Sequence, residues 1–486
     1  MRSNPHDWTR FLYYSRRVRQ LTIMSIGKPA GIEAAILTFV SGAWPSSNPF
    51  SALTSVYFNC DDRASTVSGN PQMDLRLLPL FVNDSVNALF VYREDPSIAE
   101  SRAVLRSIRE CGHSLKELSF AVHHKSPKLY ERNVMKLLGS LKELKYLILA
   151  VCLFTPNALF TLATLPSLSS FGLHLHYDHP SAPRRVCNRK RKNLPTSASY
   201  REALKAGSLD LARFQALALQ GPLGFVTDTL TLIRSSGGLT VLTVDMLSLA
   251  TVESVKDFIS RISVSCPNLE KLRLVRTERA NARALLQAEL EPVTVQTLQP
   301  LIEVKRLSAF KLMHTQPAHI SDVELVGWVS RCKSLRELHL THAPLNTLAP
   351  VTLTLGVLPH ICAMRPEMMA LSLCVDIGTT LTFVAQSGQS FSNMHHFNRL
   401  RHLNLGLSPI PAQFMNKMVL FLREILPLGQ QLAAELDNCQ IMETLDENLN
   451  QRSLRQKRWV IVSRRLATTM ELRIAHQKKL LRSKPN

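Results

Sequence analysis

The sequence predicts an α/β solenoid, in which parallel strands line a concave face and helices line the convex face. Three observations predict it. A short apolar pattern recurs along the chain, its copies share more than their apolar residues, and stretches of helical period lie between them. A chain of 486 residues could instead hold three ordinary domains, but the recurrence favours one extended array in which each unit contacts its neighbours.

The pattern is L-x-x-L-x-L, with apolar residues at relative positions 1, 4 and 6, so that positions 4 and 6 share one face of a short strand. The bare template is weak, because roughly 44 chance matches are expected at this apolar content. Its spacing is more informative, since eight of the twelve intervals fall between 28 and 35 residues. The thirteen copies begin at Val18, Leu53, Val86, Leu115, Leu144, Leu168, Phe214, Leu239, Leu269, Leu307, Leu335, Met368 and Leu400.

The best copies also carry charged or polar residues in the gaps of the pattern, as SLKELSF, ELKYLIL, NLEKLRL, SLRELHL and RLRHLNL show. Segments of helical period follow several of them. The segment 252–262 places five apolar residues on one helix face, and the segment 323–332 behaves similarly. Short turns, SCPN, RCKS and TLPS, then lead into the next strand. The five residues on the first of these faces are Val252, Val255, Phe258, Ile259 and Ile262.

This order of strand, loop, helix and turn resembles the leucine-rich-repeat family, and the period near 30 resembles its long-repeat members. The resemblance implies a horseshoe-shaped solenoid. The family's Asn or Cys three residues after the last Leu is mostly absent, since Leu274 is followed by VRT and Leu340 by THA. We therefore expect irregular loops.

The two ends are similar to fungal F-box and leucine-rich-repeat proteins. DWTRFLYYSRRVRQLTI (7–23) resembles the segment that opens their repeat array, and KRWVIVSRRL (457–466) resembles the helix that closes it. The resemblance implies the substrate-binding region of an adaptor for a cullin-RING ubiquitin ligase. No Leu-Pro or Cys-x-x-Trp of an F-box occurs before Val18. Either the chain is incomplete at its N-terminus, or it is a repeat protein without the ligase-binding module.

We predict an array over residues 1–440, with a disordered basic insertion near 178–205, and a basic C-terminal capping helix and tail over 441–486. The net charge of +21 supports these boundaries, because residues 451–486 hold eleven Lys or Arg against one acidic residue. Six more basic residues lie in the insertion: Arg184, Arg185, Arg189, Lys190, Arg191 and Lys192.

The insertion is either a solvated loop or a nuclear-import or anion-binding patch. The tail has apolar residues at helical spacing, which favours a helix that caps the array with a basic outer face, against binding to nucleic acid or a membrane surface. These apolar residues are Trp459, Val462, Leu466, Met470 and Leu472.

No catalytic or nucleotide-binding motif occurs, so we predict no enzyme and no cofactor. His174, His176 and His179 with Cys187 are the nearest approach to a metal site, and we interpret them as surface residues. The nine cysteines form no C-x-x-C pair, which indicates reduced thiols inside the cell. Neither a secretory signal nor a membrane span is expected, so the predicted location is cytoplasmic or nuclear and no membrane partner is predicted.

The useful surface is then the concave face, where positions 3 and 5 of each repeat should meet solvent. Early repeats offer aromatic and aliphatic residues there, and later ones offer basic residues and histidines. Such a gradient suits a protein partner with apolar and acidic parts. The alternative is a nucleic-acid partner that binds the basic loop and tail. The predicted binding residues are Tyr57, Phe90, Tyr146, Ile148, Lys271, Arg273, Lys311, His339 and His402.

Overall fold

The fold is described from a computed structural model of the whole chain. The described residues are 13–24, 50–60, 78, 81–94, 98–110, 112, 114–123, 128–150, 161–162, 165–174, 214–221, 223–232, 238–246, 251–275, 291–341, 349–381, 397–427 and 446–482. The basic insertion near 178–205 and the six basic residues from Arg184 to Lys192 lie outside them.

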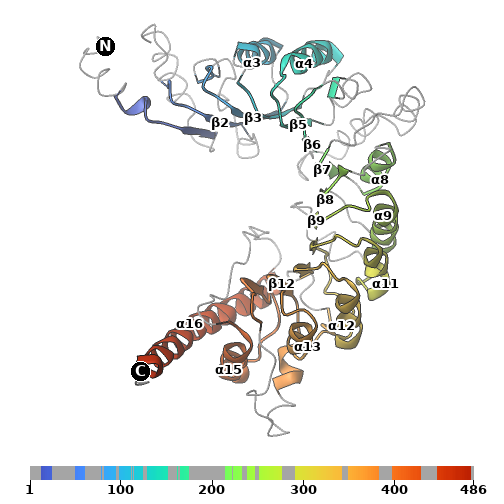
Figure 1. The fold of residues 1–486 in the computed structure, drawn as a ribbon, viewed down its shortest axis with the longest axis vertical. Helices are drawn as coiled ribbons and strands as arrows, with labels where there is room; N and C mark the ends of the chain where they lie inside the picture. The colour runs from blue at the N-terminus through green and yellow to red at the C-terminus, as the bar shows by residue number, and fades with distance from the viewer. Residues whose placement is uncertain are drawn as a thin grey trace. The chain divides into compact units, whose positions relative to one another are not determined.

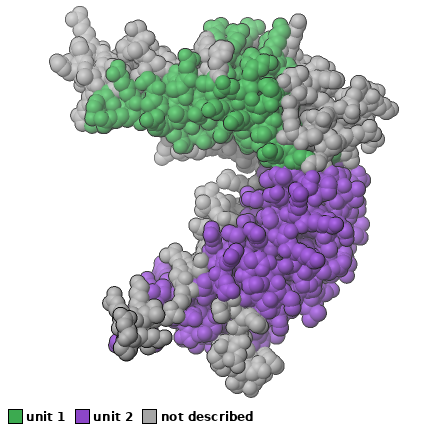
Figure 2. Space-filling model, viewed as in Figure 1, with its two compact units in different colours: residues 1–220, 228–238 green, residues 221–227, 239–486 purple. Residues whose placement is uncertain are grey.

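Two compact units make up the chain, residues 1–220 with 228–238 and residues 221–227 with 239–486 (Figure 2). Within each unit the strands are hydrogen-bonded in chain order, and every pair whose register is described is parallel. Unit 1 contains β1 (Gln20–Met24), β2 (Ser55–Cys60), β3 (Ala88–Glu94), β4 (Glu117–His123), β5 (Tyr146–Ala150), β6 (Ser170–His174) and all but the last residue of β7 (Ala216–Gly221). Unit 2 contains β8 (Val241–Met246), β9 (Lys271–Val275), β10 (Ala309–Leu312), β11 (Glu337–Leu340), β12 (Ala370–Leu373) and β13 (His402–Asn404).

Among the described residues, the helices between strands lie along one side of the strands in each unit (Figure 1). They are α3 (Ile98–Glu110), α4 (Lys128–Ser140), α8 (Leu223–Leu232), α9 (Val252–Ser265), α11 (Val295–Leu298), η5 (Gln299–Glu303), α12 (Asp322–Arg331) and α13 (Val357–Met364). After β13 follow η7 (Ala412–Phe414), α15 (Met415–Ile425) and α16 (Asp446–Arg482). Parallel strands in sequence order with helices on one side are the architecture of a leucine-rich-repeat solenoid. The predicted fold class is therefore confirmed.

Each of the thirteen strands begins two residues after a predicted start of the apolar pattern. One backbone contact recurs from repeat to repeat and sets this register. The carbonyl at position 2 of one repeat accepts hydrogen bonds from the N–H groups at positions 2 and 3 of the next. For example, the Arg336 carbonyl accepts from Met369 (2.7 Å) and Ala370 (3.2 Å). Such contacts hold neighbouring strands in step regardless of their side chains.

The strands contribute the side chains at positions 1, 4 and 6 to the core, which the helices complete. In the repeats that start from Leu53 to Leu400, all three are buried. In the first repeat Val18, Leu21 and Ile23 are each half-buried among the described residues. The alternation follows from strand geometry, because successive side chains point to opposite faces of the sheet.

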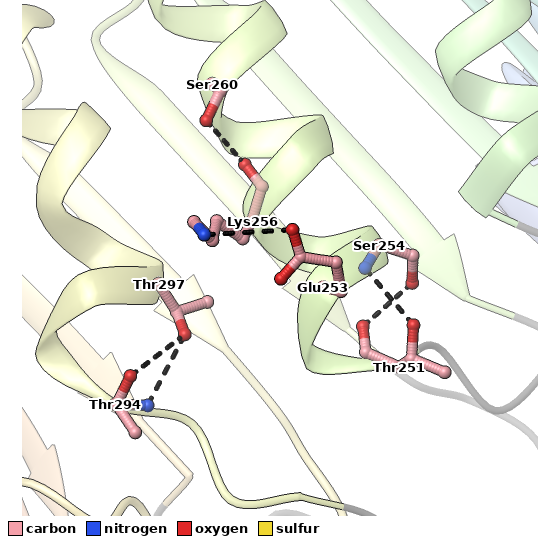
Figure 3. A network of polar contacts seen from close by, with 7 residues as sticks. All are labelled: Thr251, Glu253, Ser254, Lys256, Ser260, Thr294 and Thr297. Atoms are coloured by element: carbon pink, nitrogen blue, oxygen red, sulfur yellow. Dashed lines mark hydrogen bonds and ion pairs between the residues drawn. The ribbon is translucent and has the colours of Figure 1, made fainter.

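The helix α9 buries the five residues that the sequence predicts for its inner face. Its first turn is capped, because the Thr251 hydroxyl accepts from the Ser254 N–H (3.2 Å) while the Ser254 hydroxyl donates to the Thr251 carbonyl (2.8 Å) (Figure 3). In the neighbouring α11, the Thr297 hydroxyl similarly approaches the Thr294 N–H (3.4 Å) (Figure 3). Polar residues at these positions therefore satisfy helix ends that would otherwise lack partners.

The helix α12 begins with a capping box, in which Ser321 and Glu324 satisfy each other's backbone N–H groups (3.3 and 2.8 Å). These contacts with Ser321 hold the pKa of the Glu324 carboxyl below its usual range. The helix has the helical period predicted for the segment 323–332, with a buried face made of Leu325, Trp328 and Val329. Val323, in its first turn, is 84% exposed.

In several loops between repeats, a Ser or Thr hydroxyl accepts a hydrogen bond from a backbone N–H of a neighbouring loop. The Thr341 hydroxyl accepts from the Ala318 N–H (2.9 Å), and the Thr352 hydroxyl accepts from the Ile320 N–H (3.0 Å). Ser408, three residues after the last apolar residue of its repeat, accepts from the Val375 N–H (2.8 Å). Ser and Thr hydroxyls at varying positions thus bind the loop backbone in this chain, where the Asn or Cys expected from the leucine-rich-repeat resemblance is mostly absent.

The helix α16 packs against α15 and the segment after β13. Trp459, Val462, Leu466 and Met470 are buried there, as the sequence predicts. Leu472 was wrongly predicted to join them, and it is 67% exposed. Counted at 100° per residue, it lies well away from the line of Trp459, Val462 and Leu466. The domain boundary between 440 and 441 stays a prediction.

Candidate recognition surface

The side chains at positions 3 and 5 of each repeat point to the face of the sheet opposite positions 4 and 6. We call the surface that they form the open face. All nine of the predicted binding residues lie on it: Tyr57 on β2, Phe90 on β3, Tyr146 and Ile148 on β5, Lys271 and Arg273 on β9, Lys311 on β10, His339 on β11, and His402 on β13. The first four belong to unit 1 and the other five to unit 2.

In unit 1, two aromatic rings stack on the open face. Tyr57 and Phe90 are register partners on neighbouring strands, and their ring centroids lie 4.3 Å apart with an interplanar angle of 2°. Both side chains are only half-buried. Rings on neighbouring strands can stack in this way because the strand spacing of about 4.8 Å is close to the distance between stacked rings, and the pair forms one apolar feature of this face.

Phe90 belongs to a row of register partners that continues across the next three strands as Ser119 on β4, Ile148 on β5 and Gly172 on β6. Large and small side chains therefore alternate along this row. A Cβ on Gly172 would come within 3.1 Å of the Ile148 side chain, so the isoleucine leans over the glycine. The stacked aromatic pair and Ile148 are therefore two separate large apolar groups on this face, with Ser119 between them.

Tyr146 lies beside Glu117 of the preceding strand. Partial burial and, secondly, the Glu117 carboxylate raise the pKa of the Tyr146 hydroxyl. The phenol thus keeps its proton at neutral pH and can donate a hydrogen bond at the edge of an apolar surface. This combination of an apolar ring and a polar tip is common in binding sites.

In unit 2, basic residues and histidines follow one row of the open face. Arg273, Lys311 and His339 are successive register partners on β9, β10 and β11. Lys271 lies two residues before Arg273 on β9 and on the same face. Lys271 and Arg273 are exposed, whereas Lys311 is half-buried. Like charges on neighbouring strands repel, so this row favours an anionic partner.

Some residues of this face were not anticipated. Tyr92 continues the aromatic surface two residues after Phe90, because β3 extends past the six-residue pattern. Asp245 on β8 and Glu337 on β11 place two carboxylates on the same face as the basic row. Continuing the alternation to position 7, and reading acidic as well as basic positions, would have identified them.

His174 ends β6, whereas His176, His179 and Cys187 lie outside the described residues. Within the parts of the chain that the structure describes, no group of three or more His, Cys, Asp or Glu residues could hold a metal ion. Over the same ranges, no helix combines the length and apolarity needed to cross a membrane.

No protein-family model matches the chain, and no curated protein matches it. Among solved structures, the chain is similar to one described as the crystal structure of a TLR13–ssRNA13 complex, at 13% identity and a TM-score of 0.31. The match covers 80% of this chain and 56% of that chain. So distant a likeness carries no functional argument, and the fold assignment rests on the strands and their register.

Proposed function

We propose that this protein is a recognition scaffold that holds a protein partner on its open face and catalyses no reaction. The observation that carries the proposal is the stacked pair Tyr57 and Phe90, presented half-exposed on neighbouring strands. Aromatic residues provide much of the binding energy at protein interfaces, because they bury a large area with few rotatable bonds.

The rigidity of the sheet supports this role. Within each unit, neighbouring repeats are tied by two hydrogen bonds to one carbonyl, so the open-face side chains of that unit are held in fixed register before a partner binds. A preorganised surface loses little conformational entropy on binding. More of the contact free energy therefore remains as binding affinity.

The finer proposal is that the scaffold is the substrate-binding part of a ubiquitin-ligase adaptor, acting in the cytoplasm or nucleus with ligase components as further partners. It is supported by the resemblance of the two ends to fungal F-box and leucine-rich-repeat proteins. Trp459 and Val462, which carry the closing part of that resemblance, are buried in α16. Residues 7–12 of the opening part lie outside the described residues.

A nucleic-acid partner on the basic tail receives less support, because part of the tail's charge serves the fold. Arg455, Arg458 and Arg473 donate hydrogen bonds to the carbonyls of Leu407 (3.0 Å), Ile410 (2.6 Å) and Arg423 (2.5 Å) respectively. These arginines hold α16 in place. We therefore retain the open face and a protein partner as the proposed function.

The test is the double substitution Tyr57→Ala and Phe90→Ala in the tagged full chain. Since loss of an interface hot-spot residue costs about 2 kcal/mol or more, we expect capture of the main protein partner from the protein's own cells to fall at least about tenfold. Quantitative mass spectrometry of the captured proteins measures this.

A matched control is Tyr13→Ala with Tyr14→Ala. It removes two tyrosines that are 53% and 56% exposed and whose ring centroids lie 5.3 Å apart, so it also removes a pair of aromatic rings in contact. This control should still capture the partner that the open face binds. Wild-type capture by the Tyr57 and Phe90 variant would contradict the proposed function.

A further inference from the structure

Two histidines from strands that are not neighbours meet on the open face of unit 2. The rings of His339 on β11 and His402 on β13 have centroids 5.8 Å apart, although β12 runs between their strands. They can meet because β12 presents only Ala370 and Ser372 to this face. The two imidazoles therefore stand over a floor of small side chains.

The orientation of one ring is fixed from below. Nδ1 of His339 lies 2.6 Å from the Ser372 hydroxyl oxygen, and Ser372 is fully buried. A histidine held by a hydrogen bond through one nitrogen has its other nitrogen directed elsewhere, which is how proteins aim imidazoles at ligands. The ring of His402 lies beside it, so an acceptor above β12 can contact both rings.

Charges near the pair favour an anion there. The charged side chains on the open face of the described strands β8 to β13 are Lys271, Arg273 and Lys311 against Asp245 and Glu337, a net charge of +1. Only Glu337 shares a strand with either histidine, and β12 contributes no charge. If both histidines take up a proton, the net charge of this face rises to +3. Among the described strands of this face, the histidines thus decide whether the net charge is near zero or clearly positive.

We propose that this face binds an acidic peptide segment in extended conformation, which crosses the strands from β9 to β13 and places one carboxylate against both His339 and His402. The inference rests on the proposed function and names the class of partner. Four strand spacings of about 4.8 Å make a track of about 19 Å, which about six extended residues span. Lys271, Arg273 and Lys311 bind the acidic side chains at the other end of the track.

Binding should then strengthen as the pH falls. A carboxylate between two imidazoles forms charge-assisted hydrogen bonds only when the rings are protonated, and histidine is the side chain that ordinarily gains its proton just below neutral pH. Glutamate side chains remain ionised there, because they protonate at lower pH. The proton-dependent part of the affinity therefore belongs to the histidines, and the constant part to the lysines and arginine.

The experiment titrates the full chain into hexaglutamate labelled with tetramethylrhodamine and follows fluorescence anisotropy at about pH 6 and about pH 8. We expect the wild type to bind at least about fivefold more tightly at the lower pH. His339→Gln with His402→Gln should abolish this difference while leaving the affinity at the higher pH within about twofold. The matched control, His319→Gln with His360→Gln, removes two exposed histidines of unit 2 outside the open face and should retain the full pH response.

Three results would overturn the inference: no binding of hexaglutamate by the wild type, a pH response that survives in the His339 and His402 variant, or equal binding of hexaglutamine. A six-nucleotide oligothymidine provides the comparison with a nucleic-acid ligand, and tighter histidine-dependent binding of it would also reject the peptide. The first three results leave the proposed function standing, because it is judged separately by capture with the Tyr57 and Phe90 variant.

Discussion

Trp459→Ala is expected to loosen the C-terminal end of unit 2 by about 3–5 kcal/mol, the usual cost of removing a buried tryptophan. The side chain is 4% exposed, and its indole N–H donates to the Ser408 carbonyl (3.1 Å). Its loss leaves both a cavity and a carbonyl without that donor. In a repeat array, each unit contacts only its neighbours, so the damage should stay near the last repeats.

Cys374 offers a local measurement of this loosening. Burial raises the pKa of its thiol to about 12, although Arg455 and a hydrogen bond with Ser408 oppose the rise, so the thiol is unreactive while α16 is in place. Alkylation of Cys374, followed by peptide mass spectrometry, should be much faster in Trp459→Ala than in the wild type. The control is Ile461→Ala, at a residue that is 39% exposed on the same helix and should change stability by less than about 1 kcal/mol. Equal alkylation rates in the two variants would argue against a capping role for α16.

Charge reversal on β9, Lys271→Glu with Arg273→Glu, should reduce partner capture at least about tenfold. The reason is that both residues are exposed on the open face next to Lys311, so the change replaces attraction for an acidic partner with repulsion. Neither substitution touches the core, because the buried side chains of this strand are Leu272 and Leu274. The measurement is capture from cells at two salt concentrations, and the difference should shrink at high salt.

The matched control for this variant is Lys305→Glu with Arg306→Glu. These two residues are exposed in the turn before β10, outside the open face, and the change in net charge is the same. Capture should remain near that of the wild type. If both double variants lose capture equally, the effect comes from overall charge and the basic row has no special role.

The strands were predictable from the sequence because the burial period of a strand is two and the pattern is anchored by its first apolar residue. The same reasoning placed Val252, Phe258 and Ile262 on the buried face of α9. Both predictions rest on local periodicity alone. Local patterns are enough wherever a repeat contacts only its neighbours.

Contacts that depend on several strands at once were not predictable in this way. The meeting of His339 and His402 requires that β12 carry small side chains at two positions, so it involves three repeats that are far apart in the sequence. The stacking of Tyr57 on Phe90 depends on the register between two strands, which no single repeat specifies. The exposure of Leu472 was missed because the residue was grouped with the other apolar residues of the tail, although at 100° per residue it lies on a different face of α16.

The central claim is that a protein partner binds the open face, and cross-linking tests it most directly. The partner is captured on the wild-type chain and treated with an amine-reactive cross-linker, and the linked lysines are identified by mass spectrometry. We expect the links to concentrate on Lys271 and Lys311, on the open face. Links confined to Lys305 and Lys333 in the turns between helices and strands, or to Lys457 and Lys479 of α16, would contradict the account.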